Sequence, residues 1–407
     1  MSSKTPDYSA PEKMPLRLEL AIYGAAMFSN SLGYMTMVVV PLWVITLNPS
    51  PLMIGIVLGS RHFLVFLYSI HGGAMMDRMD PRRIMVMFTW IGAVIPFFYP
   101  LTTWLWVLVL IQMIAGYSTA IGWIGAQAII GQTLKGSAVH AGRMSAAVRI
   151  GALLGPPLTG AAWDFGGPWL SFGTLALWGA GLMASCLALP KTPPKPGTQY
   201  VPINARDFIP RLSDYMATFS LLSIPVIATV VMLAVIRIGG FSMQSSFYVI
   251  WLEQLGYTGT TIGLLMTVFS LFGGGTSLLA GPLMKRFSGA WLAIFAVSVC
   301  ILMVTITPVL GSYALLMVAV AINGGLYGLG QPLMITMAAR GAGSQNQGKA
   351  VGLRTSANRL AATFIPIIMG AVVQFSGLEN SFYIMGGALL CLVALIAVYA
   401  KRSGATK

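Results

Sequence analysis

Residues 148–160 read VRIGALLGPPLTG, and residues 358–370 read NRLAATFIPIIMG. Both stretches lie in apolar segments, one in each half of the chain. They share three residue types at one spacing of 210 positions, in the pairs Arg149 and Arg359, Pro156 and Pro366, and Gly160 and Gly370. A repeat at this interval indicates a chain built from two similar halves.

The composition places both halves in a membrane. Of the 407 residues, 57% are hydrophobic and 8% are charged, whereas a soluble protein carries about 25% charged residues. Apolar runs long enough to cross a bilayer recur along the whole chain. They cover residues 18–46, 52–76, 84–103, 105–132, 144–164, 169–189, 222–252, 259–284, 289–309, 312–338, 351–374 and 381–400. We therefore predict an all-α polytopic membrane protein with twelve transmembrane helices.

One long polar segment divides these spans into six and six. Residues 190–221 are basic and rich in proline, which is typical of a linker. The predicted organisation is two six-helix bundles in pseudo-twofold repeat. Its parts are an N-terminal tail (1–17), a first bundle (18–189), the linker (190–221), a second bundle (222–400) and a C-terminal tail (401–407).

The basic residues predict the orientation. The net charge is +14, but these residues are dispersed between the apolar runs, so the charge does not indicate nucleic-acid binding. With the N-terminus in the cytoplasm, twenty of the twenty-four Lys and Arg, Arg354 included, fall on the cytoplasmic side, as the positive-inside rule requires. The remaining four lie within spans and are Arg61, Arg149, Arg237 and Arg359. We expect a multi-pass protein of the cytoplasmic (inner) membrane with both termini in the cytoplasm.

The loop between spans 2 and 3 carries a recognisable pattern. Its glycine, acidic and basic residues are Gly73, Asp77, Arg78, Arg82 and Arg83. In this loop, and over essentially its full length, the chain resembles the major facilitator superfamily, although Asp80 stands where that family has a second glycine. The resemblance implies that the loop is a cytoplasmic latch in which Asp77 holds one access state closed. The alternative is a simple basic anchor, which leaves Asp77 unexplained.

Span 5 resembles the antiporter motif of the drug and metabolite efflux branch of this family. The matching residues are Gly151, Gly155, Pro156 and Gly160. Glycines four apart let helix backbones approach closely, and proline bends a helix. The resemblance implies an exporter scaffold in which these residues, with Pro366 in the repeat, serve conformational change. Ala361 and Ile365 replace the first two glycines in the second half, which predicts a close approach in the first bundle only.

Two departures count against copying a drug–proton antiporter. In span 4, Gln112 occupies the position of the family's proton-coupling arginine. No Asp or Glu lies in the middle of a predicted span, although a membrane proton carrier is normally a buried carboxylate or histidine. The candidates that remain for a proton-linked role are His62, Glu19 and Asp164.

By the same resemblance, spans 1, 4, 7 and 10 line a central cavity. Polar and aromatic side chains follow these spans at helical spacing. The substrate-binding candidates are Asn30, Tyr34, Gln112, Trp123, Arg237, Gln244, Asn323, Tyr327 and Gln331, with Arg61 from span 2. For each one, a role in holding helices together is the alternative.

Arg237 lies close to the middle of span 7, and no mid-span carboxylate can pair with it. It must face water, a carbonyl group or an anionic substrate. With Arg61 it makes the cavity cationic, so we expect an anionic or carboxylate-bearing substrate. Gly239 and Gly240 follow Arg237 and predict a bend. Arg149 and Arg359 occupy equivalent positions of the repeat, where a gating role fits better than substrate binding.

These features predict a secondary active transporter that works by alternating access and exports a small anionic or amphipathic organic compound. Uptake of an organic anion by symport or exchange is the alternative on the same fold, and a non-transporting sensor or assembly factor is a third hypothesis. The sequence shows no metal-ligand cluster, phosphate-binding loop or nucleophile–base pair, so we expect no enzyme activity, metal or cofactor. The expected partners are the substrate and the lipid bilayer, without nucleic acid, for a monomer.

Overall fold

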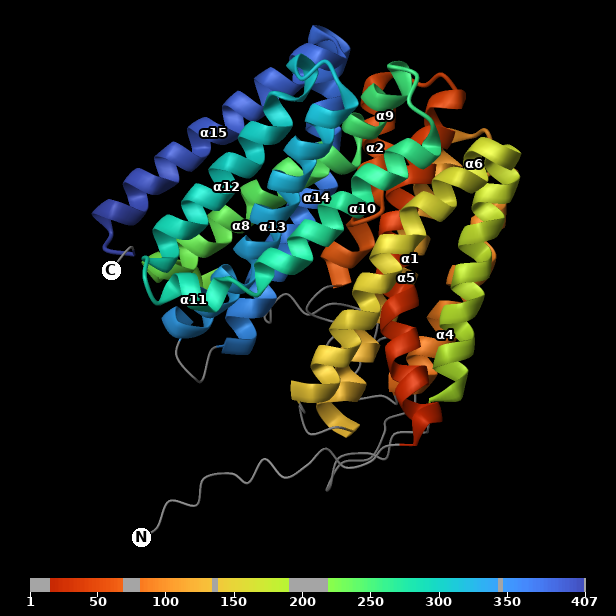
Figure 1. Ribbon diagram of the computed structural model, residues 1–407, viewed down its shortest axis with the longest axis horizontal. Coiled ribbons are helices and arrows are strands. Elements are labelled where there is room, and N and C mark those ends of the chain that lie inside the picture. Colours follow the sequence, from red (N-terminus) through yellow and green to blue (C-terminus); the bar gives the residue numbers. More distant parts are fainter. Residues whose placement is uncertain (1–14, 69–80, 134–137, 190–218, 343–346, 406–407) are drawn as a thin grey trace.

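The computed structural model describes residues 15–68, 81–133, 138–189, 219–342 and 347–405, and within these ranges it contains helices and turns but no strand. The helices form two groups that lie side by side (Figure 1). The first group holds α1 (Leu16–Thr46), α2 (Pro51–Ser60), α4 (Pro81–Val94), the short 3-10 helix η1 (Ile95–Phe98), α5 (Leu105–Thr133) and α6 (Ala138–Ala188). The second holds η3 (Ser220–Ser223), α8 (Pro225–Ser245), α9 (Phe247–Gln254), α10 (Gly259–Ser277), α11 (Ala280–Met284), α12 (Gly289–Thr305), η4 (Thr307–Val309), α13 (Tyr313–Ala342), α14 (Gln347–Ser376) and α15 (Leu378–Arg402).

Helix α6 contains two membrane spans. Its backbone leaves helical geometry at Gly166 (φ −140°, ψ 15°) and Gly167 (φ 61°, ψ −154°). Gly167 adopts a positive φ that side chains disfavour, and Pro168 next to it lacks the N–H that would continue the helix. The sequence therefore breaks the chain where spans 5 and 6 were predicted to separate.

Nine helices of the described ranges are long and apolar enough to cross a membrane. The helix over Gly142–Ala188 counts as two spans because of the break at Gly167. The shorter apolar helix α12, and α4 together with η1, supply the remaining two. The predicted all-α architecture of twelve transmembrane helices in two bundles is confirmed.

The bend in span 7 does not lie where the glycines predicted it. Gly239 and Gly240 lie inside the continuous helix α8, and the break comes at Ser246 (φ −122°, ψ −91°), between α8 and α9. Gly239 is instead a packing position, because a Cβ there would come within 3.4 Å of Leu389 and 3.6 Å of Ile365. In this conformation the helix is continuous at the glycine pair, and the gating bend expected there stays a prediction for another state of the cycle.

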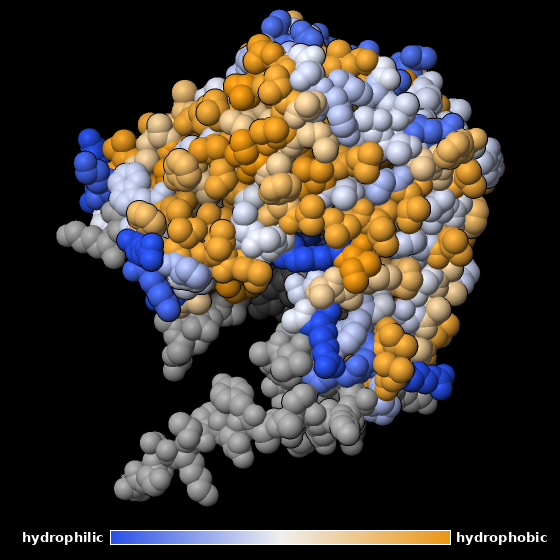
Figure 2. Space-filling model, in the orientation of Figure 1, coloured by the Kyte–Doolittle hydropathy of each residue, from blue (hydrophilic) through white to orange (hydrophobic). Residues whose placement is uncertain are grey.

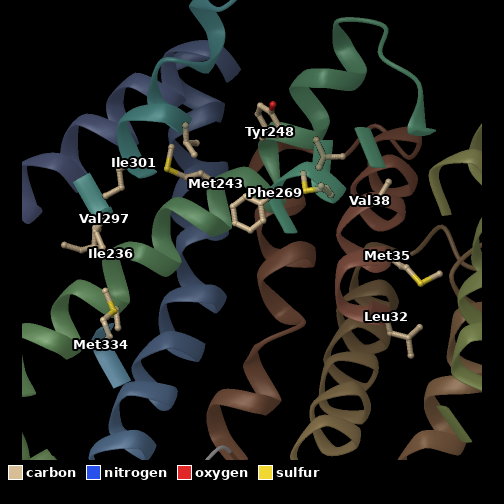
Figure 3. Packing of buried hydrophobic residues seen from close by; sticks show 14 of the residues in the cluster. Leu32, Met35, Val38, Ile236, Met243, Tyr248, Phe269, Val297, Ile301 and Met334 are labelled. Carbon is tan, nitrogen blue, oxygen red and sulfur yellow. The ribbon is translucent and has the colours of Figure 1, made fainter. Parts of the chain in front are cut away.

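Each bundle has a core of tightly buried apolar side chains. Figure 3 shows Leu32, Met35 and Val38 along α1, and Ile236 with Val297 and Ile301 in the second bundle. All six are at most 5% exposed. The outward surface is also apolar over much of the molecule (Figure 2), as expected for a protein that faces lipid.

The two bundles meet along two seams at which backbones nearly touch. At one seam, Gly263 of α10 lies so close to α6 that an added Cβ would come within 2.5 Å of the Pro156 carbonyl oxygen. At the other, α2 packs against α14, and a Cβ on Gly55 would collide with the Pro366 carbonyl. Pro156 and Pro366 thus occupy equivalent places in the two seams. The two halves of the chain therefore repeat in how their helices pack as well as in sequence.

Gly160 and Gly370 also mark these seams. A Cβ on Gly160 would collide with the carbonyl of Gly259, and one on Gly370 would come within 2.5 Å of the Pro51 carbonyl oxygen. Gly160, Pro156 and Pro366 therefore lie where the two bundles touch. This position is consistent with the role in conformational change that was predicted for them.

Gly151 and Gly155 instead face the neighbouring helix of their own bundle. A Cβ on either would come within 2.9 Å of α1 side chains, those of Met27 and Ser31 at Gly151 and that of Met35 at Gly155. In the second bundle, a Cβ on Gly239 would lie 3.6 Å from Ile365, which is an ordinary contact distance. The restriction of the closest approach to the first bundle stays a prediction.

The seams close the space between the bundles at one end only. At that end Asp164 of α6 reaches across to the start of α10, where it accepts hydrogen bonds from the backbone nitrogens of Gly259 (2.7 Å) and Thr260 (2.8 Å) and from the Thr260 hydroxyl (2.5 Å). The opposite end, where α1 begins, is hollowed between the two bundles (Figure 2). A carboxylate at the positive end of a helix is a favourable contact, so Asp164 fastens the closed end.

Candidate functional site

The hollow between the bundles leads into one cavity with two lobes. Their volumes are about 420 Å³ and 230 Å³. The larger contains Arg149 and is called the 149 lobe, and the smaller contains Arg359 and is called the 359 lobe. Both are lined by the same five side chains, which we call the waist and which are Asn30, Tyr34, Trp123, Tyr327 and Gln331. The shared lining makes the two lobes one continuous space.

The 149 lobe lies along the seam between α6 and α10. Arg149 donates a hydrogen bond from Nη2 to the Ser277 hydroxyl at 3.2 Å. Its guanidinium lies against Gly274, where a Cβ would collide with it. Phe269 and Ser270 complete the wall on the α10 side. The arginine of the sequence repeat therefore ends in the cavity, although a gating role was expected for it.

The 359 lobe lies along the opposite seam, between α2 and α14. Nη1 of Arg359 is 3.4 Å from Nδ1 of His62, and Arg61 lines the same lobe. A guanidinium only donates, so Nδ1 of His62 accepts and the ring is neutral in this contact. Arg61 is 7% exposed. This lobe thus holds two guanidinium groups and one neutral imidazole.

A break after α2 places Arg61 and His62. The helix ends at Ser60, and the chain turns at these two residues before it resumes a helical course to Tyr68. The Arg61 backbone also lies directly against Gly116 of α5, where a Cβ would collide with its carbonyl. Glycine at 116 therefore allows α2 to approach α5.

The waist is aromatic and uncharged. The ring of Tyr327 stacks on Phe241 with centroids 5.0 Å apart and an interplanar angle of 28°. Behind it, the Arg237 guanidinium lies 4.1 Å from the centre of the Tyr327 ring and donates to the Tyr327 carbonyl at 3.4 Å. Such a cation over a ring face is attractive, so Arg237 holds Tyr327 in place.

Arg237 itself is 3% exposed and is not among the described residues that line either lobe. Of the three partners that the sequence left open for Arg237, which were water, a carbonyl group and an anionic substrate, the structure shows the carbonyl group. This contact lies beside the cavity, behind Tyr327. Arg354, which was expected on the cytoplasmic side, is buried in α14 at 7% exposure. Helix α14 begins before this residue and carries it inside.

Three other predicted binding residues form buried pairs. Asn323 donates to Gln244 at 2.8 Å, which links α13 to α8. Gln112 accepts from the Tyr99 hydroxyl at 2.9 Å. These bonds are consistent with the alternative role of holding helices together. Six of the ten predicted binding residues line the lobes, and they are Asn30, Tyr34, Arg61, Trp123, Tyr327 and Gln331.

A third, smaller cavity of about 30 Å³ lies beyond the 359 lobe and shares Met37, Arg61 and His62 with it. Gln112 and Ser246 also line it. The volume suits about one water molecule among polar partners. It extends the polar interior of the protein past the lobe, alongside the seam residue Pro366.

The predicted proton-linked acids lie away from the lobes. Glu19 accepts a hydrogen bond from Arg143 at 3.2 Å and lies 3.8 Å from His140. The Tyr23 hydroxyl is 2.6 Å from Nδ1 of the same histidine. Asp164 lies at the closed end, as described above. No Asp or Glu is among the described residues that line the two lobes.

Of the predicted latch, only the basic end can be placed. Arg82 donates to the Leu187 carbonyl at 2.9 Å, which ties α4 to the end of α6, and Arg83 is exposed. Gly73, Asp77 and Arg78 lie outside the described residues.

Sequence reasoning missed several residues of the site. Phe241, Phe269 and Ser277 line the lobes, and His140 joins Glu19. The serine and the phenylalanines resemble many others in apolar spans, so no local pattern distinguishes them. His140 is 3% exposed, but its position in the first turn of α6 gave no signal of a partner in α1.

Comparison with known proteins agrees with this architecture. The family model described as Major Facilitator Superfamily matches residues 22–236 and 230–407. The uncharacterized MFS-type transporter YhhS of Escherichia coli (strain K12) is 26% identical over 95% of this chain and 94% of its own length. Among solved structures, a point mutant of the nucleoside transporter NupG superposes with a TM-score of 0.80 at 14% identity, covering 94% of this chain and 99% of that one.

A bacterial homologue of the human lysosomal transporter Spinster, in an inward-facing and unoccupied conformation, superposes with a TM-score of 0.69 at 16% identity, covering 97% of this chain and 98% of that one. At such identities these structures show the fold alone. Together with the family match over both halves, they establish that the chain belongs to the major facilitator superfamily and is a multi-pass membrane transporter rather than an enzyme.

Proposed function

We propose that the protein is a secondary active transporter that exports a small anionic or amphipathic organic compound across the cytoplasmic membrane by alternating access. One observation carries the proposal. Three guanidinium groups, those of Arg61, Arg149 and Arg359, line the cavity, and no carboxylate is among its described lining residues. Uncompensated positive charge in a site of low dielectric attracts an anion.

The open side of the cavity supports loading from the cytoplasm. It opens at the end where α1 begins, which the distribution of Lys and Arg assigns to the cytoplasm. The seams at Gly263 and Gly55 close the other end. In this state a substrate enters from inside the cell, as an exporter requires.

Uptake by exchange or symport is the second candidate, and the same lining supports it. With no carboxylate at the described lobes to carry a proton, a second anion can serve as the counter-substrate. His62 is the titratable imidazole beside Arg359. An exchange mechanism would need no other coupling group.

Counterflow in proteoliposomes tests the proposal. Vesicles loaded with one unlabelled organic acid from a panel should take up the same labelled acid, and this uptake should exceed that of empty vesicles severalfold. Repeating the assay with an imposed pH gradient separates proton-coupled transport, which the gradient drives in empty vesicles, from anion exchange, which requires internal acid. Counterflow with neutral or cationic compounds and none with acids would contradict the anion assignment.

Replacing Arg237 by Met should lower transport roughly tenfold or more while leaving the melting temperature in detergent unchanged or higher. A guanidinium buried at mid-membrane costs roughly 2.5–3.5 kcal/mol, and removing its charge removes that cost. Transport falls because Tyr327 loses the cation that holds its ring. Initial rates and thermal unfolding of the purified variant measure the two effects.

The matched control is Arg340→Met, which removes an exposed cation from the last turn of α13. It should transport like the wild type. Normal rates in a well-folded Arg237→Met variant would show that Arg237 has no part in transport.

A further inference from the structure

We propose that the transported compound is a dianion with a negatively charged group at each end, one bound in the 149 lobe and the other in the 359 lobe. The inference deepens the proposed function and rests on it. The two negative charges of the substrate would match the guanidinium groups of the two lobes, and its uncharged middle would lie at the waist.

The two lobes are equivalent halves of one site. Arg149 and Arg359 occupy the same position of the internal repeat, on the helices α6 and α14 that form the two seams. Each guanidinium has a polar partner from the helix across its seam, Ser277 of α10 for Arg149 and His62, just after α2, for Arg359. Each lobe therefore offers a guanidinium already oriented by a hydrogen bond that it donates to the opposite bundle.

The waist between the lobes is suited to an uncharged middle section. The aromatic side chains of Tyr34, Trp123 and Tyr327 line both lobes. Asn30 and Gln331 add amide groups that both donate and accept hydrogen bonds. A planar or apolar segment with few polar atoms fits this lining, whereas a third charge would find no guanidinium there among the described residues.

The number of charges also favours a dianion. The described lining carries three guanidinium groups and no carboxylate, and His62 is neutral in its contact with Arg359. A monoanion would leave two positive charges without compensation when the cavity closes and excludes water. A dianion leaves one, and it contacts both bundles at once, so its binding couples the two halves that must move together.

A second consequence is that the lobes contribute unequally. The 359 lobe retains Arg61 when Arg359 is lost, whereas Arg149 is the one guanidinium among the described residues of its lobe. Removing Arg149 should therefore convert the site from one that selects dianions into one that accepts monoanions.

The test compares linear and aromatic dicarboxylates of increasing length with their monomethyl esters, which keep the shape and remove one charge. Binding to the purified full-length protein in nanodiscs is measured by titration. We expect at least one diacid to bind roughly tenfold or more tightly than its half ester, because guanidinium–carboxylate pairs are strong charge-assisted bonds. In Arg149→Gln that ratio should fall to about one, with the half ester bound as in the wild type.

The control variant is Arg340→Gln, which removes an exposed cation outside the cavity and should keep the wild-type ratio. Equal binding of diacid and half ester by the wild type would overturn the dianion inference while leaving an anion transporter in place. An unchanged ratio in Arg149→Gln would equally overturn it, because the second charge would then bind elsewhere. Failure of all diacids and half esters to bind, with binding of uncharged diesters instead, would overturn the inference and the proposed anion specificity together.

Discussion

Adding one methyl group at Gly263 should nearly abolish transport without unfolding the protein. In Gly263→Ala the new Cβ would lie 2.5 Å from the Pro156 carbonyl oxygen, a backbone atom that cannot move aside alone. Forcing extra atoms into a packed contact costs roughly 1–3 kcal/mol. In the proposed cycle this penalty applies only when the seam between α6 and α10 is closed, so the variant should favour the alternative access state.

A shift of this size changes the ratio of the two states by roughly 5- to 150-fold. Rates of counterflow, together with the labelling of single cysteines placed in the lobes, measure transport and access separately. We expect fewer cysteines accessible from the side of the α1 N-terminus, with normal yield after purification.

Gly275→Ala is the matched control on the same helix. No atom lies within 4 Å of the Cβ that it would add, and alanine in a helix is favoured over glycine by roughly 1 kcal/mol. This variant should transport normally and unfold at the same or a higher temperature. Equal transport by Gly263→Ala and Gly275→Ala would show that seam closure is not part of the cycle.

Removing the charge of Asp164 should open the closed end. The carboxylate accepts three hydrogen bonds at the start of α10, two of them from backbone nitrogens. In Asp164→Asn the amide group cannot accept at both of its ends, and the attraction to the helix terminus is lost. Charge-assisted bonds of this kind contribute roughly 1.5–3 kcal/mol, so access from the Asp164 side should rise at least severalfold.

Distances between spin labels on the ends of α6 and α10 report this opening directly. Thr260→Val, which deletes only the hydroxyl bond, should give a smaller change in the same direction. Glu379→Gln is the control, because that acid contacts Trp251 within the second bundle and does not cross the seam. Unchanged distances in Asp164→Asn would rule out the cross-bundle contact as a closing device. The proton-linked role expected for Asp164 stays a separate prediction, which the pH dependence of transport addresses.

Features set by local chemistry could be predicted from the sequence. The spans follow from the length of the apolar runs, and the break between spans 5 and 6 follows from Gly166, Gly167 and Pro168. The repeat of arginine, proline and glycine indicated two equivalent bundles. Asn30, Tyr34, Tyr327 and Gln331 of spans 1 and 10, which the family resemblance assigned to a cavity, line the two lobes, and helical periodicity places each set on one face of its helix.

The errors and omissions share one physical cause. Gly239 and Gly240 suggested a bend, but both lie inside the continuous helix α8, and the break comes at Ser246. Gln244 and Asn323 had the same polar character as the lining residues, yet they bond to each other inside the bundle. The type of a residue limits the contacts that its side chain can make. Which of these contacts forms depends on the neighbouring residues in the folded protein.

The sequence by itself determined the number of spans, their grouping into two bundles and the excess of arginine over acid within them, since hydropathy and helix-breaking residues act over a few positions. Only the tertiary structure decided which arginines reach the cavity. Arg149 and Arg359 line it beside Ser277 and His62, partners 128 and 297 positions away in the chain, while Arg237 lies behind Tyr327. Contacts at such separations depend on how each helix is rotated against its neighbours, and that rotation is fixed by the packing of all the helices together.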